Sequence, residues 1–117
     1  MKKEDVAKHW ELLVSNLTKQ FNADEELDVD GILFLIGVQE LGLGPKKFKK
    51  DEKINLIHIA ICKVLEPYGY YNFKGLDDQG WPHYELTHAL PNLKPGEQSV
   101  LIKEAIVEYA LGNGIIE

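Results

Sequence analysis

The side chains best suited to covalent chemistry are His58 and Cys62, which lie four residues apart. Residues at this spacing share one face of a helix, so the thiol and the imidazole could form a nucleophilic pair. Both residues have isoleucines as neighbours in the sequence, and a thiol in apolar surroundings stays protonated and inert. We therefore expect His58 and Cys62 to be core residues, and we predict no catalytic residue.

A second group of polar and aromatic side chains lies in a segment with the alternation of a β-strand. Trp81, His83 and Glu85 alternate with Tyr84 and Leu86, and successive side chains of a strand point to opposite faces. We expect the face with Tyr84 to pack on the helices. Trp81, His83 and Glu85 would then share the more exposed face.

An exposed tryptophan beside polar groups suits the binding of a ligand or a partner. The sequence thus predicts a binding site formed by Tyr71, Trp81, His83 and Glu85. His83 could tune binding because histidine titrates near neutral pH. In the alternative interpretation, Trp81 folds over a helix end and the other side chains are only solvated.

Signatures of metal and cofactor sites are missing from the sequence. His83, Glu85 and His88 are close together, but no cysteine pair accompanies them as in zinc sites. Glu104 and Glu108 are four residues apart, yet the chain has no Glu-x-x-His motif of the di-iron type. No glycine-rich loop stands between a strand and a helix. We predict no metal and no cofactor.

The charge of the chain argues against nucleic acid as a partner. Nineteen acidic residues outnumber thirteen basic ones, and every basic residue is a lysine. Arginine is the usual residue for bidentate recognition of phosphate and guanine, and an acidic protein repels the nucleic-acid backbone. The lysine-rich stretch 46–53 could contact an anionic partner, but the acidic chain without arginine favours a solvated loop and helix start there.

Other features favour a cytoplasmic protein that does not enter a membrane. Cys62 is the single cysteine, so no disulfide forms within the chain. No apolar segment follows Lys2 and Lys3, as a secretory signal would require. The longest apolar run, 32–38, is far shorter than the roughly 20 residues that span a bilayer.

Apolar periodicity and capping residues predict a mainly α fold in a single domain, 1–117. A largely buried central helix is expected around the apolar run 32–38, with the other helices packed on it. Two runs flanking the turn Asp77–Gly80 predict a small β-hairpin between the third and fourth helices. The predicted helices cover 4–21, about 29–41, 51–66 and 95–111.

Two residues of the central helix carry more specific expectations. Glycine inside a helix costs about 1 kcal/mol relative to alanine, so Gly37 should mark a close approach of another helix. Glu40 ends an otherwise apolar segment. We expect it to form a surface ion pair with Lys46 or Lys47.

Three segments together resemble a family of small bacterial proteins that has no assigned activity. They are Phe34-Leu-Ile-Gly-Val-Gln-Glu-Leu-Gly42, His58-Ile-Ala-Ile-Cys-Lys-Val-Leu-Glu-Pro-Tyr-Gly-Tyr-Tyr71 and Gly80-Trp-Pro-His-Tyr-Glu-Leu86. The resemblance covers most of the chain from the central helix onward. It implies a bacterial domain that stands alone, and it implies no catalytic residue.

Two classes of function remain open. The first is a non-enzymatic interaction or accessory protein that binds a protein partner or forms a homodimer, because two helices are apolar nearly all round and Ile115-Ile116 adds an apolar end. The second is a small ligand-binding protein or enzyme that uses the aromatic and histidine residues of 70–88. A convergent polar pocket with shifted pKa values would favour the second class, and a flat apolar patch the first.

Overall fold

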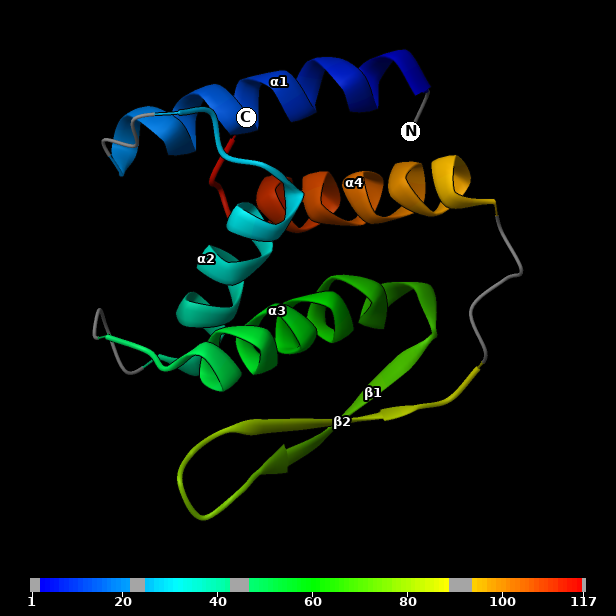
Figure 1. Ribbon diagram of the computed structural model, residues 1–117. Coiled ribbons are helices and arrows are strands. Elements are labelled where there is room, and N and C mark those ends of the chain that lie inside the picture. The colour runs from blue at the N-terminus through cyan, green and yellow to red at the C-terminus, as the bar shows by residue number, and fades with distance from the viewer. Residues whose placement is uncertain (1–2, 22–24, 43–46, 89–93, 117) are drawn as a thin grey trace. The chain divides into compact units, whose positions relative to one another are not determined.

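The described part of the chain is mainly helical, with one small hairpin (Figure 1). The computed structural model describes residues 3–21, 25–42, 47–88 and 94–116. The elements are α1 (Lys3–Gln20), α2 (Val29–Leu41), α3 (Lys50–Leu65), the 3-10 helix η1 (Glu66–Tyr68), β1 (Tyr71–Leu76), β2 (Pro82–Leu86) and α4 (Pro95–Gly112). The predicted helical class and the hairpin between the third and fourth helices are confirmed. The packing of the other helices around α2 stays a prediction.

The chain divides into two compact units. One unit comprises Met1–Ile32 and Leu93–Glu117, and the other comprises Leu33–Asn92. The first unit therefore contains α1 and α4, while the second contains most of α2, all of α3 and the hairpin. The single domain expected from the sequence stays a prediction.

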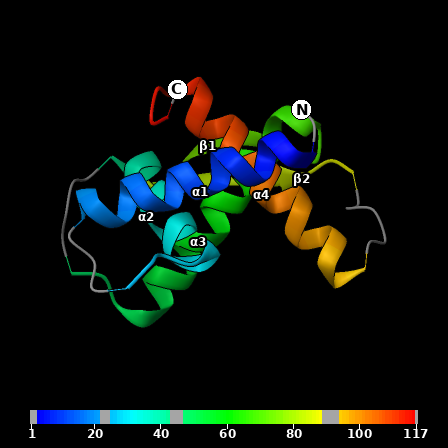
Figure 2. The same ribbon diagram turned by 90° about the horizontal axis from the view of Figure 1, so that it is seen from above.

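In the first unit, α1 packs against α4 and crosses it in Figure 2. Leu13 of α1 and Ile106 of α4 are fully buried. The Lys103 Nζ lies 5.4 Å from the centroid of the Trp10 ring, which is a cation–π distance. Ile116 is also buried, so the apolar end of the chain packs on the protein itself.

In the second unit, Gly37 lets α2 approach α3 closely. A Cβ atom at Gly37 would collide with the backbone carbonyl of Leu56, so any larger residue would push the two helices apart. The close approach expected from the cost of a helical glycine is confirmed. Beside this contact, Leu41, Phe48 and Leu56 form a buried cluster, and Trp81 of the hairpin packs against it.

The ends of α2 and the start of α3 follow local hydrogen bonding. Asp28 precedes α2, and its Oδ1 accepts a backbone N–H of the first turn at 2.8 Å. Gly42 ends α2 in the left-handed region, with φ of 72°. At α3, the Glu52 Oε1 accepts the N–H of Lys49 at 2.9 Å. Lys49 is therefore the N-cap residue of α3.

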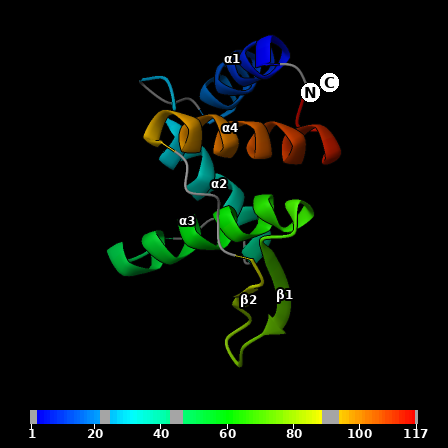
Figure 3. The same cartoon turned by 90° about the vertical axis from the view of Figure 1, so that its right-hand side faces the viewer.

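The hairpin pairs β1 with β2 in antiparallel register, and Phe73 lies opposite Tyr84. The register shifts between Phe73 and Gly75, where Gly75 has φ of 125°, and Gly80 completes the turn with φ of 86°. Both strands contact α3 and lie on one side of it (Figure 3). The two strands flank the turn Asp77–Gly80, as the sequence predicts.

Glu40 forms an ion pair with a lysine of α3. The Lys63 Nζ lies 3.8 Å from the Glu40 Oε1 and also 3.8 Å from the Glu66 Oε1. Glu40 thus pairs with a side chain of α3, and its expected pair with Lys46 or Lys47 stays a prediction. Lys46 lies outside the described residues, and Lys47 is exposed.

None of the helices in the described ranges is long and apolar enough to cross a membrane. The apolar α2 has 13 residues, against the roughly 20 that a bilayer requires.

Candidate functional site

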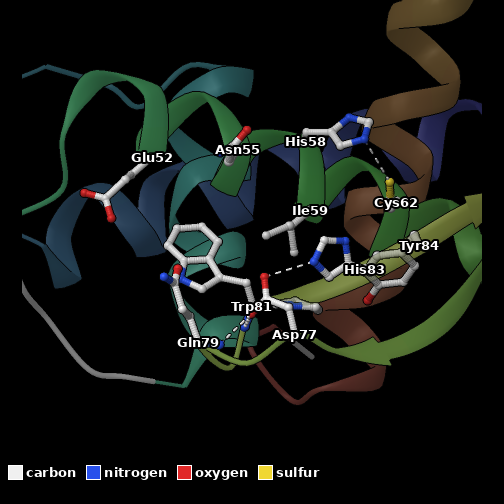
Figure 4. A pocket seen from close by; sticks show the side chains of 11 residues that line it. Glu52, Asn55, His58, Ile59, Cys62, Asp77, Gln79, Trp81, His83 and Tyr84 are labelled. Carbon is white, nitrogen blue, oxygen red and sulfur yellow. Dashed lines mark hydrogen bonds and ion pairs between the residues drawn. The ribbon is translucent and has the colours of Figure 1, made fainter.

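A pocket of about 380 Å³ lies between α3 and the hairpin, entirely within the second unit. Figure 4 shows side chains from the helix and from the hairpin around it. The residues that line the pocket are Glu52, Asn55, His58, Ile59, Cys62, Asp77, Gln79, Trp81, Pro82, His83 and Tyr84. The pocket therefore brings together two imidazoles, two carboxylates, two amides and a tryptophan.

The helical wall follows from the period of α3. Glu52, Asn55, Ile59 and Cys62 recur at steps of three and four residues, so they share one face of the helix. The hydrogen bond between Glu52 and the N–H of Lys49 fixes the carboxylate end of this face. Cys62 is buried at the other end. One helix face thus supplies acidic, amide and thiol groups to a single pocket.

His58 and Cys62 form a contact on this wall. The Cys62 Sγ lies 3.6 Å from the His58 Nε2. Burial raises the pKa of the Cys62 thiol to about 11, so the thiol is protonated at neutral pH. The expected burial of Cys62 is confirmed, and its low reactivity stays a prediction. The expectation of a buried His58 is wrong because His58 is exposed.

The hairpin wall is organised by the carboxylate of Asp77. Its Oδ1 accepts the backbone N–H groups of Gln79 and Trp81, both at 2.9 Å. Its Oδ2 lies 3.0 Å from the His83 Nε2. The hydrogen bond to His83, followed by the one from the Trp81 N–H, holds the pKa of Asp77 below its ordinary value. Asp77 is thus an anion that fixes the positions of both Trp81 and His83.

Trp81 differs from the residue expected on an exposed strand face. β2 begins at Pro82, so the alternation of the strand does not include Trp81. Its N–H is bound by Asp77, and its side chain is half-buried against the cluster that contains Phe48 and Leu56. The expectation that Trp81 shares an exposed face with His83 and Glu85 is therefore wrong. Trp81 nevertheless lines the pocket together with His83.

Tyr84 forms the third part of the hairpin wall. Its side chain is half-buried, as expected for the face of β2 that packs toward the helices, but Leu86 of the same expected face is 55% exposed. Burial, with a smaller contribution from Glu40, raises the pKa of Tyr84 to about 12. The ring makes an edge contact with Phe73, with 5.6 Å between ring centroids. Tyr84 is thus a neutral phenol at physiological pH.

Two of the residues expected in the site do not line the pocket. The Glu85 Oε2 pairs with the Lys74 Nζ at 2.7 Å on the exposed surface of the hairpin. The Tyr71 ring makes an edge contact with the His58 ring, with 6.5 Å between centroids, and burial raises the pKa of Tyr71. Neither residue is part of the pocket lining, which contains Trp81 and His83 from the expected set.

Asp77, Glu52 and Asn55 are residues of the pocket that sequence reasoning missed. The sequence marks Asp77 as a turn residue, and aspartate in a turn commonly binds nearby N–H groups, which was a signal for its role. The helical spacing that links His58 to Cys62 also extends back to Asn55 and Glu52, which lie three and six residues before His58. That spacing was a usable signal.

A scan against protein-family models and searches of curated proteins and of solved structures found no match to this chain. In the described ranges, no three His, Cys, Asp or Glu side chains are arranged to hold a metal ion. The chemistry of the pocket is therefore inferred from its own residues.

Proposed function

We propose that the protein binds a small molecule, without covalent chemistry, in the pocket between α3 and the hairpin. The observation that carries this proposal is the convergence of Trp81, His58 and His83 with the anion Asp77 on one cavity. Its volume of about 380 Å³ lies within the roughly 300–1,000 Å³ that is usual for small-molecule sites. Shifted pKa values of the lining groups are a further mark of functional sites.

Binding is favoured over catalysis because the thiol of Cys62 is buried and protonated. Cys62 is the only thiol in the chain, and it is buried with a pKa of about 11. A thiol of this kind is a poor nucleophile at neutral pH. The Nε2 of His83 is engaged by Asp77, so the Nδ1 is the ring nitrogen left to bind a ligand.

The preorganisation of the hairpin wall supports the same proposal. Trp81 is held at its backbone by Asp77 and at its ring by the apolar cluster, so it loses little freedom when a ligand arrives. Avoiding this loss increases affinity. The Trp81 ring provides apolar contact area for a ligand, and the imidazoles and amides provide directed hydrogen bonds.

Thermal-shift measurements with a panel of cationic, neutral and anionic fragments would test the proposal. Ligands that bind the folded protein raise Tm through mass action. Hits should lose their effect in Trp81→Leu and keep it in Trp10→Leu, which removes the half-buried tryptophan of the other unit. A panel without hits, or hits that survive Trp81→Leu, would contradict the proposal.

A second candidate function is binding of a protein partner or of a second copy of the chain. It is favoured by three large apolar side chains of the hairpin, Phe73, Leu76 and Leu86, which are 49%, 64% and 55% exposed. Apolar groups gathered on one small element are typical of interaction surfaces. Light scattering after gel filtration tests self-association, and a monomer mass at high micromolar concentration would refute the homodimer.

A further inference from the structure

We propose that the pocket selects small organic cations, with an alkylammonium group seated against the Trp81 ring. This inference rests on the proposed function and adds the chemical class of the ligand. The charges of the lining side chains are its first support. Glu52 and Asp77 are carboxylates, and none of the thirteen lysines of the chain is among the residues that line the pocket.

The lysines nearest in sequence do not reverse this charge. Lys49 and Lys53 flank Glu52, but both are exposed and neither lines the pocket. The N-terminal end of α3 is a partly positive environment, and the bond from the Lys49 N–H to Glu52 already uses one of its donors. A carboxylate or phosphate ligand would face the Glu52 carboxylate and the Asp77 carboxylate, of which Asp77 is hydrogen-bonded to His83. A cation would be attracted to both carboxylates.

The aromatic ring is an independent second support. Trp81 is half-buried against Leu41, Phe48 and Leu56, so its ring is partly desolvated and held in place. The face of an indole ring attracts cations, and the attraction strengthens as water is removed. In the view of Figure 4, the ring lies between Glu52 of α3 and Asp77 of the turn.

Quaternary ammonium ions fit this combination particularly well. They donate no N–H hydrogen bonds, so they depend on aromatic faces and diffuse negative charge rather than on a tight ion pair. Asp77 already binds His83 and two backbone N–H groups, which take three of the roughly four acceptor positions of a carboxylate, so it offers charge with little capacity for a further directed hydrogen bond. Glu52 has one oxygen engaged in the same way.

The test compares choline with its uncharged carbon isostere, 3,3-dimethylbutan-1-ol, and with the anion 3,3-dimethylbutanoate. These probes have nearly the same shape and differ in charge. NMR titrations at low ionic strength should give a Kd for choline about tenfold below that of the isostere, with weaker binding still for the anion. An isostere that binds as tightly as choline would overturn the inference.

Matched variants distinguish binding of choline in the pocket from nonspecific attraction of choline to an acidic protein. Glu52 and Glu97 each accept the N–H of their helix N-cap residue, and glutamine can preserve that bond. Glu52→Gln should weaken choline binding about threefold, while Glu97→Gln should leave it unchanged. Equal effects of the two variants would show only nonspecific attraction to an acidic protein and would overturn the inference.

The same titrations distinguish this inference from the proposed function. Binding of neutral or anionic probes at Trp81, with no preference for choline, overturns the cation class and leaves the pocket as a binding site. A lack of binding by probes of every charge overturns both. Trp81→Leu should abolish the preference for choline, and its folding is checked by circular dichroism before the titration.

Discussion

Each wall of the pocket contains a histidine, but the group beside the histidine is neutral on the helical wall and ionised on the hairpin wall. On the helical wall, His58 lies beside the Cys62 thiol, and burial keeps that thiol neutral with a pKa of about 11. On the hairpin wall, His83 lies beside the carboxylate of Asp77, and hydrogen bonds keep that carboxylate ionised at lower pH than usual. His58 therefore lies beside a neutral group, whereas His83 lies beside an anion.

Burial is the physical source of the difference. Cys62 is 1% exposed, so its charged form would lose most of its hydration. Asp77 is exposed, and its three hydrogen bonds add to the stability of an anion that is already hydrated. The helical wall is thus an inert support, whereas the hairpin wall carries the charge and the directed groups.

The largest effect on stability is expected from a substitution that forces α2 away from α3, the helix that forms the helical wall. Gly37→Leu would drive a side chain into the backbone of Leu56, which cannot rotate away. We expect a loss of about 3 kcal/mol or more in the free energy of unfolding, and a decrease in Tm of roughly 10 °C. Differential scanning calorimetry measures both quantities.

Gly96→Ala is the matched control for this substitution. Gly96 lies in α4, and a Cβ atom there would meet no atom within 4 Å. Alanine is the better helix former, so stability should stay within about 1 kcal/mol of the parent or rise slightly. A Gly37→Leu protein as stable as the control would refute the close approach of α2 and α3.

The next effect concerns the reactivity of the helical wall. A thiol pKa of about 11 instead of 9.0 lowers the thiolate fraction at neutral pH roughly 100-fold. Iodoacetamide should therefore label native Cys62 at least about 100-fold more slowly than the denatured chain. Mass spectrometry follows the labelling at pH 7, and rapid modification of the native protein would revive the enzyme hypothesis.

Protonation of Asp77 at low pH should weaken the contacts that order the hairpin wall. A carboxylate whose pKa is lowered by folding stabilises the folded state above its ordinary pKa of 3.8, and this contribution disappears as the pH falls through the lower value of the folded state. The fluorescence of Trp81 should therefore change little between pH 7 and pH 4 and should change below that range.

Two neighbouring variants isolate the contribution of Asp77. Asp77→Asn removes the ionisable group and should abolish this component of the acid transition, while Asp78→Asn should retain it. Asp78 belongs to the same turn and has the same charge. An acid transition that is identical in the two variants would show that the Asp77–His83 contact does not order the hairpin wall.

The smallest effect is expected at the outer surface of the hairpin. The Lys74–Glu85 pair is short, but both side chains are more than half exposed. Exposed ion pairs contribute little, so Glu85→Gln should change the free energy of unfolding by less than about 0.5 kcal/mol. Urea unfolding measures this change. A loss of ligand binding in the same variant would place Glu85 in the site after all.

The elements of the fold were largely predictable because their signals are local. Asp28 before α2 and Gly42 after it mark the ends through capping and a left-handed residue. Gly37 was predictable as a contact because its cost within a helix requires a compensating approach of another segment. These arguments need only the chemistry of one residue and its nearest neighbours.

The site was less predictable because its geometry depends on nonlocal packing. His58 has isoleucines beside it in sequence, but residues adjacent on a helix point about 100° apart, so apolar neighbours do not imply burial. Trp81 follows strand alternation in sequence, yet a bond to Asp77 places it in the turn. Glu52 lines the pocket only because α3 packs against the hairpin, which follows α3 in the chain, so its place in the site was not predictable from its neighbours in sequence.

The most direct test of the account uses the two tryptophans of the chain, Trp10 and Trp81. Their indole N–H groups give two signals in a proton–nitrogen NMR spectrum, one from each compact unit. During titration with the tightest-binding fragment or with choline, the Trp81 signal should shift and saturate while the Trp10 signal stays in place. A static Trp81 signal at saturating ligand, or equal shifts of both signals, would contradict binding in the pocket between α3 and the hairpin.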